Sequence, residues 1–127
     1  MSRHERGSAT VESIFAIVML ALLTLGALQV AFVLYARNVL ASAAHEGVRA
    51  AVERGASPAD APPLVASVVR QVAGGLVSDL DVEAGASSVG EREVLTVRVS
   101  ARVAAFGPVP VEVPVSASAS SARERPR

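Results

Sequence analysis

The feature that most limits how this 127-residue chain can fold is an uncharged run of 24 residues from Ser13 to Ala36. Its polar members are only Ser13, Thr24, Gln29 and Tyr35. An α-helix rises about 1.5 Å per residue, so about 20 apolar residues cross the hydrocarbon layer of a bilayer, which is about 30 Å thick. The run is therefore long enough to form a transmembrane helix.

A signal peptide and a buried helix of a soluble protein both fit the run less well. The apolar region of a cleaved secretory signal peptide is only about 7 to 15 residues long. The sequence after Ala36 also continues as a helical pattern, with no loop at which a signal peptidase would cut. A buried helix of a soluble protein would need cover on all sides, and residues 37–127 are too few to provide it. The sequence therefore predicts a membrane span in contact with the lipid bilayer.

The residues before the span form a short polar leader, from Met1 to Gly7, which contains Arg3 and Arg6. Because short positively charged flanks stay in the cytoplasm, the leader predicts a single-pass (bitopic) protein of the cytoplasmic membrane, with its N-terminus inside and its C-terminus outside. Arg37, on the far side of the run, makes the charge difference modest.

The helical period continues beyond the apolar run, which predicts one helix over residues 8–54, about 70 Å long at the standard rise and capped by Gly55. One face of its second half is apolar and consists of Ala36, Leu40, Ala43, Ala44, Gly47, Val48, Ala51 and Val52. The opposite face is polar and consists of Arg37, Asn38, Ser42, His45, Arg49 and Glu53.

Three small residues of the apolar face, Ala43, Gly47 and Ala51, recur at every fourth position. Such a groove lets another helix approach closely. In an Ala-rich sequence the same spacing also arises by chance, so the pattern leaves a specific packing role open.

Residues 55–119 predict a small α+β domain outside the cytoplasm. Prolines at 62 and 63 and glycines at 74 and 75 delimit a short amphipathic helix. Its predicted apolar face consists of Leu64, Val65, Val68, Val69, Val72 and Leu76. Three later segments alternate with period two, which predicts a three-stranded antiparallel meander. Their apolar rows are Leu80, Val82 and Ala84, then Leu95, Val97, Val99, Ala101 and Val103, then Val109, Val111, Val113, Val115 and Ala117.

The polar residues of these segments predict how the strands pair. If the first two strands are joined by a polar loop over residues 85–92, the acidic row of Asp79, Asp81 and Glu83 lies beside Arg98 and Arg102, a favourable cross-strand combination.

Pro110 and Pro114 have the same parity, so the N–H groups they lack lie along one side of the third strand, which must be a sheet edge. The Ser- and Ala-rich tail, which then becomes charged, over residues 120–127, is predicted to be disordered.

The composition argues against several functions. Acidic and basic residues number 12 each and aromatic residues make up only 3%, so the chain has neither the charge nor the stacking surface for nucleic acid. There is no Cys, and His4 and His45 stand apart, so we expect no metal site and no cofactor. Asp79 and Asp81 lie on an exposed strand face and lack the shielded pocket of catalytic carboxylates. We therefore do not expect an enzyme.

One short motif remains, the junction ERGSATVESIF. Gly7 closes the charged leader, Ser8 begins the uncharged stretch, and Glu12 is the fifth residue counted from Ser8. This is the pattern of a prepilin signal. A second block, AAHEGVRAA, covers residues 43–51. With both blocks in this order, the chain resembles the TadE-like family of minor pilins from tight-adherence (Flp) type IV pilus systems, over about residues 5–54.

The resemblance implies a pseudopilin-like protein that is stored in the membrane and cut between Gly7 and Ser8 by a prepilin peptidase. It further implies incorporation into, or priming of, a Tad-type pilus or related secretion apparatus, together with other pilin or pseudopilin subunits and the Tad assembly machinery. No cofactor is implied.

Physical chemistry explains why these residue types suit cleavage and assembly at the junction. Gly7 leaves helical geometry readily, which suits a bond that a peptidase must draw into an extended conformation. Cleavage would create an amine at Ser8, and Glu12, one turn along, can pair with that amine in its own or a neighbouring subunit. Glu12 also fits the role of an acid in the first helical turn. A capping box is excluded, because it would need Glu where Val11 stands.

Two further functions remain open. The chain fits an uncleaved single-pass accessory protein of an envelope or secretion complex, which the mature N-terminus would distinguish from a pilin. It also fits a membrane-tethered binding module whose sheet captures a ligand. Ligand-dependent stabilisation of residues 56–120 would support such a module.

Overall fold

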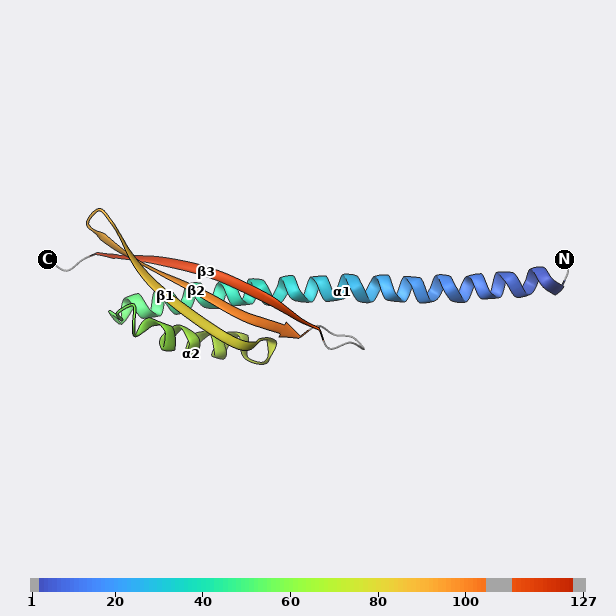
Figure 1. The fold of residues 1–127 in the computed structure, drawn as a ribbon, viewed down its shortest axis with the longest axis horizontal. Coiled ribbons are helices and arrows are strands. Elements are labelled where there is room, and N and C mark those ends of the chain that lie inside the picture. The colour runs from blue at the N-terminus through green and yellow to red at the C-terminus, as the bar shows by residue number, and fades with distance from the viewer. Residues whose placement is uncertain (1–2, 105–110, 125–127) are drawn as a thin grey trace. The chain divides into compact units, whose positions relative to one another are not determined.

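The computed structural model describes residues 3–104 and 111–124. Its elements, in chain order, are α1 (Arg3–Glu53), α2 (Ala61–Ala73), a 3₁₀ turn η1 (Gly74–Leu76), β1 (Ser78–Val89), β2 (Arg92–Ala104) and β3 (Glu112–Glu124) (Figure 1). A long apolar N-terminal helix, a short second helix and a three-stranded antiparallel sheet confirm the predicted fold class. The chain divides into two compact units, Met1–Phe32 and Val33–Arg127, which are described separately.

In the first unit, α1 exposes large apolar side chains all around the helix, including Val11, Ile14, Phe15, Ile17, Leu20, Leu22, Leu23 and Leu28. The hydroxyl of Ser13 donates to the carbonyl oxygen of Ala9, and that of Thr24 to the carbonyl oxygen of Leu20, each at 2.8 Å. Hydroxyls satisfied within their own helix are tolerated in lipid.

The helix is long and apolar enough to cross a membrane, with a mean hydropathy of 2.5, and none of its apolar window is buried in the protein. It is compatible with a single-pass membrane protein.

The ends of α1 differ in how well the sequence predicts them. The helix begins at Arg3 and not at Ser8, because no proline interrupts the leader and a single glycine costs a helix only about 1 kcal/mol.

The cap predicted at Gly55 is confirmed. Gly55 has a φ of +66°, its N–H donates to the carbonyl of Val52, and the N–H of Ala56 donates to the carbonyl of Ala51 at 2.9 Å. These two bonds form a Schellman motif, which ends the helix at Glu53.

In the second unit, the sheet covers α2 and the part of α1 that belongs to this unit (Figure 1). The predicted apolar face of α1 is confirmed: its eight residues are buried, except that Val52 is half-buried, and the six residues of the polar face are exposed. The helical period alone was sufficient to predict this face, because one side of α1 packs against the domain.

The second helix is delimited as predicted, with prolines in its first turn and Gly74, at a φ of +42°, at its end. Its predicted apolar face is partly wrong. The buried row is Ala61, Val65, Val69 and Ala73, whereas Val72 is 46% exposed. A close contact with α1 at Val65 sets the rotation of α2 about its axis, and this contact turns Val72 outward.

The sheet is the predicted meander, in the order β1-β2-β3. All five predicted apolar residues of the central strand are buried. Those of β1 are half-buried. On β3, Val115 is buried and Val113 and Ala117 are half-buried, whereas Val111 precedes the strand and is exposed. Val109 lies outside the described residues.

The predicted placement of the acidic row of β1 beside the arginines of β2 is confirmed. Glu83 of β1 lies opposite Arg98 of β2, and the guanidinium of Arg102 lies 3.8 Å from Asp79. Arg102 also donates to Glu112 of β3 at 3.3 Å. Pro114 lies on β3, which is an edge strand as predicted, and Pro110 lies outside the described residues. Because these charged side chains are about half exposed or more, the pairs add little stability.

Two predictions about irregular segments are wrong. Most of the predicted loop over residues 85–92 is strand: β1 and β2 pair as far as Val89 and Arg92, and the turn consists of Gly90 and Glu91. Gly90 has a φ of +64°, which suits a two-residue hairpin turn. The tail predicted to be disordered is strand as far as Glu124, which pairs with Arg92. Both segments lack apolar alternation, and backbone pairing with β2 orders them.

Candidate functional site

The prepilin-type junction lies on the surface of α1. Gly7, Ser8 and Glu12 are all exposed, and a Cβ added at Gly7 would meet nothing within 4 Å. Because Ser8 and Glu12 are four residues apart in a helix, their side chains lie one above the other on the same face. An amine at Ser8 would therefore lie one helical turn from a carboxylate. The structure also places Gly7 inside α1, which begins at Arg3.

The small-residue groove of α1 faces inward. Ala43, Gly47 and Ala51 are all buried. A Cβ added at Gly47 would lie 3.0 Å from Cγ1 and 3.1 Å from Cα of Val65. The helix that approaches Gly47 is therefore α2 of the same chain. This contact belongs to the core of the domain, and it leaves Gly47 covered and unavailable to a neighbouring subunit.

Replacing Gly47 by Leu should strongly destabilise the domain. The new side chain would meet the backbone of α2, so the two helices must separate, and overpacking of this kind costs about 3 kcal/mol. For a domain of this size, that loss lowers Tm by about 15 °C. Thermal unfolding of the full chain in detergent, followed by circular dichroism, measures the shift.

Ser42→Leu is the matched control, because Ser42 lies on the exposed face of the same helix. Its Tm should stay within about 3 °C of wild type. Equal Tm values for Gly47→Leu and wild type would show that α2 does not pack against Gly47.

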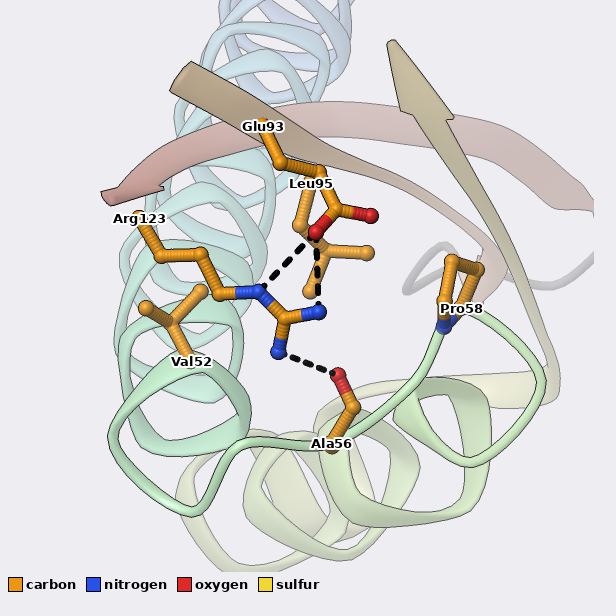
Figure 2. A pocket seen from close by; sticks show the side chains of 6 residues that line it. All are labelled: Val52, Ala56, Pro58, Glu93, Leu95 and Arg123. Carbon is orange, nitrogen blue, oxygen red and sulfur yellow. Dashed lines mark hydrogen bonds and ion pairs between the residues drawn. The ribbon is translucent and has the colours of Figure 1, made fainter. Parts of the chain in front are cut away.

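A second cluster lies where the α1–α2 loop meets the sheet. Nε and Nη2 of Arg123 both donate to Oε2 of Glu93, at 3.1 and 2.9 Å, and Nη1 donates to the carbonyl oxygen of Ala56 at 3.4 Å (Figure 2). Glu93 and Arg123 are direct cross-strand partners on β2 and β3. Their side chains are only 26% and 30% exposed, so the pair is partly shielded from solvent.

This cluster stabilises the fold and does not form a ligand pocket. The cavity beside it holds about 10 Å³ and is lined by Val52, Ala56, Pro58, Glu93, Leu95 and Arg123. That space fits no more than one water molecule. One guanidinium thus ties both strands to the loop that follows α1. The sequence alone does not indicate the cluster, because Arg123 lies in a segment predicted to be disordered and no local pattern links residues 30 positions apart.

The other polar candidates have ordinary surroundings. His45 is exposed, and Asp79 lies beside Arg102. Within residues 3–104 and 111–124, no group of three or more His, Asp or Glu side chains could hold a metal ion.

The fold and the junction together define a protein built on an apolar N-terminal helix that carries a small α+β domain. Within this class, residues 7–49 match the family described as TadE-like protein, so the chain carries a TadE-like domain on α1. The match includes Gly7, Ser8 and Glu12 at its start and ends within the AAHEGVRAA block, of which it covers residues 43–49. No curated protein and no solved structure matches the chain. The family resemblance stated from the sequence is confirmed.

Proposed function

We propose that this protein is a minor pilin or pseudopilin that takes part in assembling a Tad (Flp) type pilus or a related secretion apparatus. The observation that carries the proposal is the match of the TadE-like family to residues 7–49, which form one continuous helix. A TadE-like domain suggests an association with a Tad pilus. The apolar surface of α1 suits storage of the chain in the cytoplasmic membrane, with the N-terminus inside and the small domain outside.

In this proposal, a prepilin peptidase cuts the bond between Gly7 and Ser8. Glycine is less favourable than alanine in a helix by about 1 kcal/mol, which makes local unwinding at this point easier. The cut removes the charged leader and leaves an amine one turn from Glu12. A carboxylate at this position pairs with the amine of its own or a neighbouring subunit, and the low dielectric at the membrane edge strengthens the attraction.

The exposed apolar side chains of α1 support a role in assembly. In the membrane they contact lipid, and after extraction they would contact the helices of other pilin subunits. Either partner covers the same surface, so the chain can pass from bilayer to pilus without exposing that surface to water. The proposed role is structural, and it needs no catalytic residue or cofactor in this chain.

A tag placed after Arg127 tests the proposal in cells that make the pilus. We expect protease added outside spheroplasts to remove the tag, because the positive leader holds the N-terminus inside. We also expect the tag to co-purify with other pilus subunits after crosslinking. A protected tag would contradict the proposed topology. An accessible tag that never crosslinks to pilus subunits would favour an uncleaved accessory protein.

A further inference from the structure

A pocket between α1 and the strands β2 and β3 is lined by two arginines and no carboxylate. It is open, holds about 550 Å³, and is lined by Arg37, Ala41, Arg98, Ser116, Ala117 and Ser118. Its polar side chains are two guanidinium groups and two hydroxyls, all of which can donate hydrogen bonds. All six residues belong to the unit Val33–Arg127. The pocket therefore offers positive charge and donors to an anion.

Within the described residues, no carboxylate forms an ion pair with Arg98, although Glu83 lies opposite it on β1. On β2 it lies between Glu83 of β1 and Ser118 of β3, and its side chain lines the pocket with Ser118. Within the part of the chain that the structure describes, neither Arg98 nor Arg37 forms an ion pair. Arg102, four residues along the same face of β2, pairs with two carboxylates. The two pocket arginines are thus free to bind a ligand.

The position of Arg37 along α1 indicates at which level of the membrane this ligand would bind. Arg37 is the first charged residue after the uncharged run that ends at Ala36. If α1 crosses the membrane, a charged residue at this place lies at the level of the lipid headgroups. Because Arg98 shares a pocket with Arg37, it lies near the same level. This step rests on the proposed function, which places α1 in the bilayer.

We propose that the pocket of Arg37 and Arg98 binds the phosphate of an anionic phospholipid headgroup at the outer surface of the cytoplasmic membrane. A guanidinium fork matches the oxygens of a phosphodiester, and two forks with adjacent hydroxyls match it better than one. Bound lipid would hold the small domain against the membrane while the protein is stored, and extraction into a pilus would require its release.

Lipid titration of the purified, uncleaved full chain in nonionic detergent tests this inference. Native mass spectrometry counts bound short-chain phosphatidylglycerol, with short-chain phosphatidylcholine and soluble glycerol phosphate as the other arms. We expect phosphatidylglycerol to bind most tightly. An arginine near an anionic surface contributes about 1 kcal/mol, which is about fivefold in Kd, so Arg37→Gln and Arg98→Gln should each weaken binding about fivefold.

Arg102→Gln is the matched control, because it removes an exposed arginine from the same strand face but not from the pocket. Its Kd should stay within about twofold of wild type. Equal losses in Arg98→Gln and Arg102→Gln would overturn the proposal, as would equal binding of the two lipids or of free glycerol phosphate. Arg98→Lys, which keeps the charge, guards against a folding defect. It should bind better than Arg98→Gln but less tightly than wild type. Binding as tight as wild type would overturn the fork geometry, and binding as weak as that of Arg98→Gln would overturn the contribution of the charge.

This experiment and the tests of pilin function can fail separately. Lipid binding is measured without a peptidase or other pilus subunits. If the chain binds phosphatidylglycerol but keeps its leader in cells, the lipid site is supported and the pilin role is contradicted. If the chain is processed but shows no lipid preference, the pilin role is supported and the lipid site is contradicted.

Discussion

Replacing Glu12 by Gln should leave the chain cut between Gly7 and Ser8 but keep it out of the assembled pilus. The substitution preserves size and helix propensity and removes only the charge that would pair with the new amine. If Glu12 served only as an acid in the first helical turn, the loss would be about 0.3 to 1 kcal/mol. Such a loss is too small to prevent assembly of the long helix that remains after the cut, over residues 8–53.

Mass spectrometry of the processed chain, with crosslinking to other pilus subunits, separates these two roles of Glu12. Glu53→Gln is the matched control, because Glu53 is an exposed carboxylate near the other end of α1, in a solvated pair with Arg49. It should be cut and assembled like wild type. Normal assembly of Glu12→Gln would show that Glu12 serves only to favour the start of the helix.

Replacing Gly7 by Arg should stop processing, so that the uncut chain accumulates in the membrane. The site has room for the new side chain, so α1 should still form. Arginine also stabilises the helix by about 0.8 kcal/mol relative to glycine, which makes the bond harder to extend for a peptidase. The loss of processing should be nearly complete, because bulk and helix stability act in the same direction. An immunoblot that separates the two forms measures it.

Gly75→Arg controls for the general effect of placing an arginine at an uncrowded glycine. It should be processed normally. A Gly7→Arg chain cut as efficiently as the Gly75→Arg chain would place the processing site elsewhere. A wild-type chain that is never cut would exclude processing.

Periodicity predicted most of the regular structure, because each element buries one face. The second half of α1 and the central strand β2 have the predicted inward rows, since their apolar residues repeat at 3.6 and 2 positions. The segments that end β1 and β3 were not predicted, because they do not bury one face. Gly85 to Val89 and Ser120 to Glu124 bury little, and they are ordered by backbone pairing that leaves no pattern in side chains.

The candidate sites were predicted to different extents. The junction at Gly7, Ser8 and Glu12 is local, so a motif was sufficient to find it. The spacing around Gly47 indicated a helix contact but not its partner, because only the tertiary fold shows that α2 fills the place. The pair of Arg123 with Glu93 and the pocket of Arg37 with Arg98 join residues far apart in sequence. No local signal identifies such sites.

The intact mass of the protein purified from native membranes shows whether the chain with this TadE-like domain is processed as a prepilin. We predict a mature chain that begins at Ser8, seven residues shorter than the full sequence and without the charges of Arg3, Glu5 and Arg6. A mass that retains Met1, or that begins at Ser2, would contradict the pilin mechanism and leave a permanently anchored membrane protein.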